Sequence, residues 1–138
     1  MGDRVLVSGT TATAPDGRIV GPGDAYRQTV RVLANIDRAL RSLGSSLDHV
    51  VRTRIYVTEL ADFDAIARAF AARFRRVRPT ATLVKVAGLI DPTMRVEIEA
   101  EAVDPLPPAR PAAARQRVRP GRPADPRRPG GSVPRRPA

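Results

Sequence analysis

The chain contains no cysteine and only one histidine, His49, among its 138 residues. Without cysteine, disulfides, thiolate metal ligands and a cysteine nucleophile are excluded. A single histidine also excludes a metal site built from several imidazoles. We therefore expect no metal centre in this protein.

Long apolar stretches are lacking as well, since no run approaches the roughly 20 apolar residues that a membrane-spanning helix needs. The N-terminus has a charged start followed by Val5, Leu6 and Val7, which is too short for the apolar region of a signal peptide. These features predict a soluble, cytoplasmic protein that has no membrane partner.

Positive charge is abundant but unevenly distributed along the chain. Residues 104–138 hold nine arginines against Asp104 and Asp125, a net charge of +7, which leaves +3 of the total of +10 for residues 1–103. The same segment holds ten of the fourteen prolines and no aromatic residue, so it cannot build a core. We predict one domain over residues 1–103 and a disordered Arg/Pro-rich tail over residues 104–138.

The tail allows two interpretations. Its arginines could bind nucleic-acid phosphates in a salt-sensitive manner without reading sequence, but the segment lacks aromatic stacking groups and any motif. Arginine, proline, alanine and glycine have GC-rich codons, and lysine is nearly absent from the chain, so genomic composition alone can produce such a tail. We favour a non-functional extension and do not expect a nucleic-acid partner. The arginines that would contact phosphates are Arg115, Arg117, Arg119, Arg122, Arg127 and Arg128.

Hydrophobic periodicity predicts the order ββαβαββ for the domain. Asp24 can cap a first helix and Gly44 can end it, and residues 62–76 return to helical spacing. Turn signals around Pro15 and Gly17 suggest that the first two strands form a hairpin. The apolar stripe of the first helix is expected at Thr29, Leu33, Ile36, Leu40 and Leu43. Strands are expected at residues 4–9, 18–20, 50–58, 81–87 and 94–103.

Two helices covering one face of this sheet give a two-layer α+β sandwich. The second helix would dock through Phe63, Ile66, Phe70 and Phe74. Residues 50–58 are the candidate central strand. Its side chains facing the helices would be Val51, Thr53, Ile55 and Val57. The uncovered face would carry Arg52, Arg54, Glu97, Glu99 and Glu101. Such a face suits solvent exposure, cross-strand pairing or a subunit interface.

Residues 4–103 resemble the RidA (YjgF/L-PSP) family. The resemblance rests on several segments in the order and spacing of that family. They are Val7-Ser8-Gly9, Gln28, Asn35-Ile36, Val50 to Val57, Asp62-Phe63, Arg78-Pro79 and Val96 to Ala100. It implies a chorismate-mutase-like fold and a homotrimer whose open sheet faces pack together, with a pocket at each subunit junction.

Family members that are enzymes hydrolyse reactive enamines or imines to a carbonyl compound and ammonia, without a cofactor. Glu97 matches the glutamate that positions water in these enzymes, although it could equally form an interface ion pair with an arginine. Ser8 and Gly9 match the end of the strand that lines the pocket, where a small residue lets the ligand approach the backbone. A plain strand-terminating turn is the alternative for these two residues.

One important position departs from the family pattern. Deaminating members carry a substrate-binding arginine where this chain has Ala81, followed by Thr82 and Leu83 on the same pocket-lining segment. Alanine cannot make a bidentate contact to a carboxylate. Arg95 and Lys85 are the residues that could supply a replacement cation.

The sequence therefore predicts a pocket that binds or hydrolyses small reactive imines, enamines or related carbonyl metabolites, and whose ligands differ from the usual 2-imino acids. Two alternatives stay open. The protein could be an authentic 2-iminobutanoate or 2-iminopropanoate deaminase that uses another cation, or a non-catalytic protein that senses a metabolite or binds nucleic acid through its tail.

Overall fold

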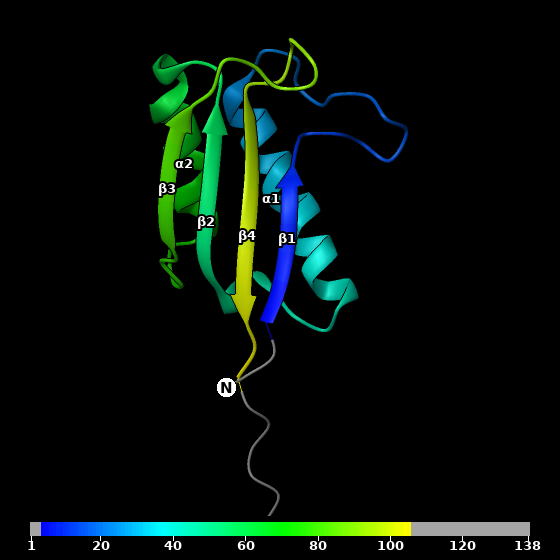
Figure 1. The fold of residues 1–138 in the computed structure, drawn as a ribbon, viewed down its shortest axis with the longest axis vertical. Coiled ribbons are helices and arrows are strands. Elements are labelled where there is room, and N and C mark those ends of the chain that lie inside the picture. The colour runs from blue at the N-terminus through cyan, green and yellow to red at the C-terminus, as the bar shows by residue number, and fades with distance from the viewer. Residues whose placement is uncertain (1–3, 106–138) are drawn as a thin grey trace, which may run out of the picture. The chain divides into compact units, whose positions relative to one another are not determined.

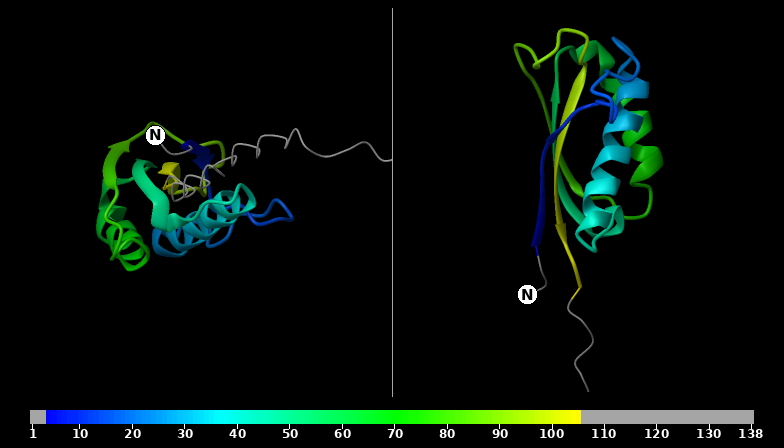
Figure 2. Two further views of the ribbon diagram at one scale, coloured as in Figure 1. Left: turned by 90° about the horizontal axis from the view of Figure 1, so that it is seen from below. Right: turned by 90° about the vertical axis from the view of Figure 1, so that its right-hand side faces the viewer.

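A computed structural model describes residues 4–105, which form a four-stranded sheet with two α-helices on one of its faces (Figure 1). The side view in Figure 2 shows the two layers edge-on, with the other face of the sheet uncovered. The predicted two-layer α+β class is confirmed. No helix within the described range is long and apolar enough to cross a membrane. The predicted tail lies outside these residues except for Asp104 and Pro105.

The sheet combines antiparallel and parallel pairing in the order β1-β4-β2-β3. The pairs β1·β4 and β4·β2 are antiparallel, whereas β2 and β3 are parallel and are joined across the sheet face by α2. The strand β2, predicted to be central, lies inside the sheet between β4 and β3. The strands are β1 (Arg4–Thr10), β2 (Val50–Val57), β3 (Thr80–Lys85) and β4 (Val96–Val103). The helices are α1 (Ala25–Ser42) and α2 (Phe63–Arg73), and two short 3₁₀ turns are η1 (Leu47–His49) and η2 (Leu60–Asp62).

The expected strand at residues 18–20 does not form, so the order of elements is βαβαββ. Only an isolated bridge between Thr13 and Ile19 is present, inside the loop that leads from β1 to α1 and projects to the right in Figure 1. Glycines with positive φ at Gly17 and Gly21 turn the backbone on both sides of the short segment. Three residues between two turns are too few to join the sheet.

The first helix follows the sequence prediction closely. Asp24 accepts a hydrogen bond from the backbone N–H of Arg27 at 2.9 Å, and Gly44, with φ of 80°, lies just beyond the helix end. Thr29, Leu33, Ile36 and Leu40 are buried, as predicted. Leu43 is 64 % exposed, because the helix ends at Ser42 and the C-capping residue leaves the apolar stripe.

The second helix is shorter than predicted and ends at Arg73. Ile66 and Phe74 are buried, and the ring of Phe74 packs against that of Phe70 with centroids 4.6 Å apart. Phe63, the first residue of the helix, is 53 % exposed and does not dock as expected. The helix is therefore held to the sheet from its middle to its C-terminal end.

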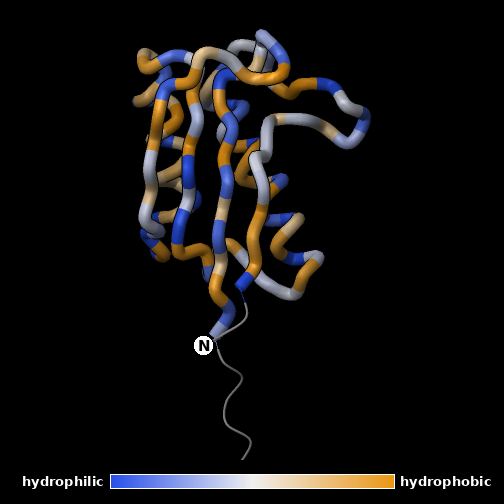
Figure 3. Tube along the Cα trace, viewed as in Figure 1, coloured by the Kyte–Doolittle hydropathy of each residue, from blue (hydrophilic) through white to orange (hydrophobic). Residues whose placement is uncertain are grey.

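The inward face of β2 differs from the predicted alternation at one residue. A register shift between Val50 and Arg52 places an extra residue, Val51, outside the ladder, where it is 44 % exposed. Val50 takes the inward place, and Thr53, Ile55 and Val57 are buried as predicted. Figure 3 shows the resulting alternation of hydrophobic and hydrophilic residues along the central strands.

Candidate functional site

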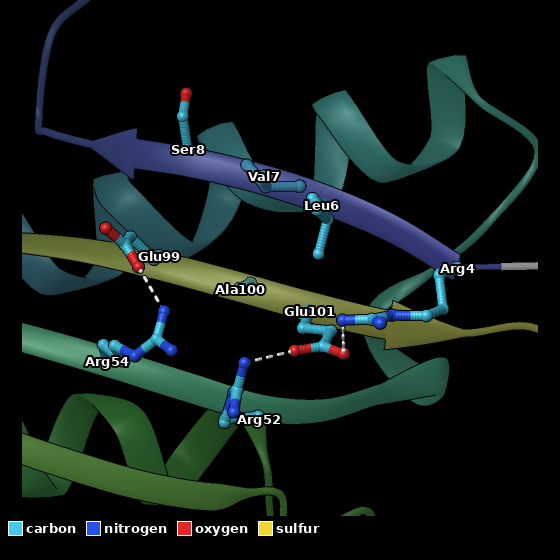
Figure 4. Close-up of a pocket in the computed structure, with 9 residues that line it drawn as sticks. All are labelled: Arg4, Leu6, Val7, Ser8, Arg52, Arg54, Glu99, Ala100 and Glu101. Atoms are coloured by element: carbon cyan, nitrogen blue, oxygen red, sulfur yellow. Dashed lines mark hydrogen bonds and ion pairs between the residues drawn. The ribbon is translucent and has the colours of Figure 1, made fainter.

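The uncovered face of the sheet carries a ladder of cross-strand ion pairs (Figure 4). Glu101 on β4 is shared by Arg4 of β1, at 2.6 Å, and Arg52 of β2, at 2.7 Å. Next along β4, Glu99 accepts from Arg54 at 2.9 Å and from the Tyr56 hydroxyl at 3.2 Å. Of the options given for this face, cross-strand pairing is present, between Arg52 and Glu101 and between Arg54 and Glu99.

A shallow cavity of about 470 Å³ lies over this ladder. Ser8 stands at one end of it, on the β1 side, and Arg54 and Glu99 face it from β2 and β4 (Figure 4). The lining is mixed, because aliphatic side chains of β1 meet the charged ladder. The cavity is lined by Arg4, Leu6, Val7, Ser8, Arg52, Arg54, Glu99, Ala100 and Glu101.

Glu97, the predicted water-positioning residue, differs from the other two glutamates of β4. It is half-buried and lies opposite Tyr56 in the strand register. Within residues 4–105 its carboxylate makes no ion pair and no hydrogen bond, whereas Glu99 and Glu101 are both occupied by arginines. Of these three carboxylates, that of Glu97 alone is therefore free to accept a proton or hold a water molecule.

Ser8 and Gly9 form a bulge in β1, where the register with β4 shifts between Val7 and Thr10. The Ser8 carbonyl accepts a hydrogen bond from the Thr10 hydroxyl at 2.8 Å, which closes the bulge locally. A Cβ atom at Gly9 would overlap the Glu97 carboxylate. The bulge thus brings the β1 backbone directly against Glu97, and only glycine fits there without displacing it.

The three predicted pocket residues of β3 are divided between the two faces of the sheet. Ala81 and Leu83 pair with the buried Thr53 and Ile55, which places them on the helix-covered side of this edge strand. Thr82 pairs with Arg54, on the open side. One chain therefore does not bring Ala81 and Leu83 onto the same face as Glu97.

The two cations predicted to replace the missing arginine are both engaged elsewhere. The Nε of Arg95 donates to Asp62 at 2.8 Å, at the start of α2, and the side chain of Arg95 is 29 % exposed. The Nζ of Lys85 lies 3.3 Å from the carboxylate of Glu59. Neither residue lines the cavity over the ladder. Arg95 is also tied through its backbone, because its N–H donates to Gln28 at 2.7 Å.

The amide of Gln28 joins three separate segments of the chain. This fully buried side chain donates to the carbonyls of Gly21, at 2.9 Å, and Thr93, at 2.7 Å, and accepts from the backbone N–H of Arg95. The contacts fix the loop before α1 and the loop before β4 to the same point of the helix. The start of β4, and with it the position of Glu97, is set in this way.

Glu99 shifts the pKa values of two neighbouring groups on the open face, Arg54 and Tyr56. Its hydrogen bond and then its negative charge raise the pKa of Arg54 above the ordinary value, so this guanidinium stays charged. Partial burial, followed by the charge of Glu99, raises the pKa of the Tyr56 hydroxyl. Tyr56 therefore remains a neutral hydrogen-bond donor at neutral pH.

The ligand-binding residues expected from the sequence do not include Arg4, Arg52 and Arg54, which line the cavity. Alternation along residues 50–58 predicts Arg52 and Arg54 on the open face, but only the register of β2 with β3 shows that Arg54 lies opposite Thr82 of the predicted pocket segment. The contribution of Arg4 depends on the β1·β4 register, which the pattern of a single strand does not give.

Comparisons with known proteins agree with this architecture. The family described as Endoribonuclease L-PSP matches residues 1–104. An uncharacterized protein of Streptomyces coelicolor is 41 % identical over 101 residues, covering 73 % of this chain and 75 % of that protein. The 3-aminoacrylate deaminase RutC of Acinetobacter baylyi is 36 % identical over 98 residues, which cover 71 % of this chain and 77 % of that protein.

Solved structures give the same result. A Mycobacterium tuberculosis member of the YjgF/YER057c/UK114 family is 38 % identical with a TM-score of 0.67, covering 75 % of this chain and 81 % of that one. A structure from Thermotoga maritima described as a putative endoribonuclease is 32 % identical with a TM-score of 0.70. The match covers 76 % of this chain and 82 % of that one. Together with the match over residues 1–104, these likenesses show that the chain belongs to the RidA (YjgF/L-PSP) family.

Proposed function

We propose that this protein forms a homotrimer in the cytoplasm and hydrolyses small reactive imines, enamines or related compounds in pockets between subunits, with Glu97 positioning the water. One observation carries the proposal. Glu97 is the glutamate of β4 that has no partner within residues 4–105, and it lies against the Gly9 bulge. Ser8 of this bulge lines the cavity, whereas Glu97 itself is not among the lining residues. A glutamate that forms an ion pair within its own chain would be occupied, as Glu99 and Glu101 are.

The chemistry requires few groups. A water held by Glu97 attacks the carbon of the C=N bond, and its oxygen forms the new C–O bond while Glu97 takes the proton. The carboxyl group then returns that proton to nitrogen, which gives a carbinolamine. The carboxylate next moves the proton of the carbinolamine hydroxyl to the nitrogen, so that the C–N bond breaks with release of ammonia while the C=O bond of the carbonyl compound forms. An enamine reaches the same intermediate after protonation to the imine. No redox partner is required, so the residues of the chain can supply the whole sequence.

Two features support a site shared between copies of the chain. Glu97 lies on the open side of the sheet, whereas Ala81 and Leu83 lie on the covered side of the edge strand β3, so one chain does not bring both segments to one ligand. The open side also exposes Leu6, at 67 %, and Val84, at 43 %. Burying these side chains against another sheet would stabilise the assembly.

The relative named 3-aminoacrylate deaminase, at 36 % identity, supports the reaction class. Ala81 limits how far the likeness extends, because the carboxylate contact usually made from that position is absent. We propose that the substrate range therefore differs from that of deaminases with arginine there.

The test is a competition assay with purified full-length protein. An imine is generated in situ by an amino-acid or amine oxidase and is trapped by semicarbazide, so hydrolysis is measured as loss of the trapped product. We expect Glu97→Gln to lower the hydrolysis rate by about 10²-fold or more, as loss of a general base does. Glu59→Gln, which removes a half-exposed glutamate that follows β2 and pairs with Lys85, is the matched control. Equal rates for wild type and Glu97→Gln would refute the mechanism.

A further inference from the structure

The first helix carries apolar residues on its outer side, where a surface helix normally carries polar ones. Tyr26, Val30 and Ala34 of α1 follow one another at four-residue spacing, so their side chains lie in a line along the helix. All three are exposed, Val30 to 48 %. This outer stripe (Tyr26, Val30 and Ala34) is separate from the buried stripe of α1, which packs in the core.

A hollow of about 330 Å³ lies on each side of the outer stripe. Val30 and Ala34 line both hollows, so the stripe and the hollows form one continuous surface. The hollow between the two helices is lined further by Leu33 of α1 and by Ala69 and Ala72 of α2. A row of side chains with a groove beside it is the form that a packing helix needs, because the ridge of one helix fits into the groove of another.

Two contacts join the helices, one near each end of the outer stripe. The guanidinium of Arg68 lies over the ring of Tyr26, 5.3 Å from its centroid, and Nη2 of Arg73 lies 2.9 Å from the carboxylate of Asp37. From Tyr26 to Asp37 the helix advances by about 16 Å, or three turns. The surface is therefore long enough for a short helical segment of a partner.

The charge around the outer stripe is positive. The helices α1 and α2 hold six arginines against two aspartates, and they contain neither lysine nor glutamate. One of the aspartates, Asp37, is already shared by two arginines. Arg27, Arg31 and Arg68 form no ion pair within residues 4–105, and the first two line the second hollow. These three cations therefore attract carboxylates to the edges of the stripe.

Charge and shape together select the occupant. Residues 104–138 hold nine arginines against two aspartates, and a second copy of the chain would present the same arginines, so both would be repelled. A nucleic acid matches the charge, but its phosphate backbone offers no apolar face to the outer stripe. An amphipathic helix with an apolar stripe between acidic residues matches both the charge and the groove.

We propose that the outer side of α1 and α2 is a docking surface for an acidic amphipathic helix of a partner protein. The apolar residues of that helix pack on the outer stripe and over the hollow between α1 and α2, and its carboxylates face Arg27, Arg31 and Arg68. The helices lie on the other side of the sheet from the open face (Figure 2), so the proposed subunit contacts leave this surface accessible. The inference therefore goes beyond the proposed function and does not rest on it.

The test titrates labelled synthetic peptides of about 18 residues, or five helical turns, with full-length protein and follows fluorescence anisotropy. The acidic probe has leucine at every third or fourth position and glutamate beside each leucine. A second peptide has lysine in place of glutamate, and a third has the residues of the acidic probe in shuffled order, without an apolar face. We expect the acidic probe to bind with a Kd below about 1 mM, at least about tenfold tighter than either control. Added salt should weaken this binding, because it screens the arginines.

Variants locate the binding on the surface. Val30→Glu places a carboxylate on the outer stripe and should weaken binding of the acidic probe by about tenfold or more. Its melting temperature should stay near that of wild type, because Val30 is half-exposed. Leu43→Glu, which adds the same charge just beyond the end of α1, is the matched control and should bind like wild type. The double variant Arg27→Glu/Arg68→Glu should lose the acidic probe and bind the lysine peptide instead.

Three outcomes would overturn the inference. They are no binding of the acidic probe up to about 1 mM, equal binding of the shuffled peptide, and binding that Val30→Glu leaves unchanged. Single-stranded nucleic acid and vesicles of anionic lipid are titrated in parallel. If Val30→Glu abolishes binding of one of these while the acidic probe does not bind, the surface serves another class of partner and the proposed helix is refuted. The rate of imine hydrolysis should be the same for wild type and Val30→Glu, so the result is independent of the proposed function.

Discussion

Gly9 lies directly against the carboxylate of Glu97, in a bulge that the two neighbouring strands share. The contact joins two residues that are 88 positions apart in the sequence. Gly9 does not have a positive φ, so an alanine would fit its backbone and would conflict only with Glu97. A substitution at Gly9 therefore tests the placement of the Glu97 carboxylate, the proposed catalytic group, separately from the stability of the strand.

We predict that Gly9→Ala lowers the rate of imine hydrolysis by about tenfold to 10²-fold, because the added methyl group displaces Glu97 and a shift of about 1 Å at a reacting group is costly. Gly88→Ala is the matched control, since nothing lies within 4 Å of the Cβ it would add. Rates of both variants are measured with the semicarbazide assay and melting temperatures by circular dichroism. Full activity of Gly9→Ala would show that the Glu97 position is not critical.

The substitution Ala81→Arg is predicted to increase activity on acidic substrates. In the proposed pocket, a guanidinium at this position supplies the carboxylate contact that the family resemblance implies there, and each charge-assisted hydrogen bond contributes about 1.5–3 kcal/mol. We expect kcat/KM for 2-iminopropionate to rise by about tenfold, with little change for an uncharged imine. A gain on both kinds of substrate would instead indicate a general effect on the pocket.

The proposed trimer predicts a specific effect of charge on the open face. Leu6→Glu places a carboxylate on an apolar, 67 % exposed side chain of that face and should dissociate the assembly into single subunits. Leu43→Glu alters a similarly exposed leucine, at 64 %, at the end of α1 and should leave the assembly intact. Sedimentation at micromolar concentration distinguishes the two. Wild-type protein that sediments as stable, folded single subunits would remove the pockets and the proposed chemistry with them.

Asp104, just after the end of β4, is expected to make the stability of the fold depend on pH in the acid range. The Ser45 hydroxyl donates to Asp104 at 2.7 Å, and this bond, together with His49, lowers the pKa of the Asp104 carboxyl. A lowered pKa in the folded state contributes stability above the unfolded value of about 3.9, and the contribution is lost as the pH falls below it.

Asp104→Asn should therefore melt at a lower temperature than wild type near pH 7, and the difference should shrink as the pH falls from about 5 to 3. Thermal melts across this range measure the difference directly. Asp48→Asn, on the adjacent turn, is the charge-matched comparison. A difference that stays constant down to pH 3 would contradict the role of the Asp104 charge.

Much of the architecture was predictable because it depends on local patterns. The helical spacing of Leu33, Ile36 and Leu40, the cap at Asp24 and the alternation along residues 96–103 each correspond to an element of the structure. The expected strand at residues 18–20 was wrong because a β-like tripeptide between two turns has no neighbour in the sheet to pair with.

The site was predictable only in part, because its properties come from pairing between strands. Alternation placed all three glutamates of β4 on one face, but only the cross-strand ion pairs show that Glu97 is the unoccupied one. The Val51 bulge likewise changes which residue of β2 faces inward, and the pattern of β2 alone gives no sign of it. The roles of Ala81, Thr82 and Leu83 remain predictions, since they depend on a second copy of the chain.

The Gln28 amide sets a narrow chemical requirement at its position. Two carbonyl oxygens need a donor there and one backbone N–H needs an acceptor, so the side chain must offer both at once from a site closed to water. Glutamate would set a negative charge against two oxygens, and leucine of similar volume would leave all three groups unsatisfied. Chains that keep this loop arrangement should therefore be restricted to an amide at this point of the first helix.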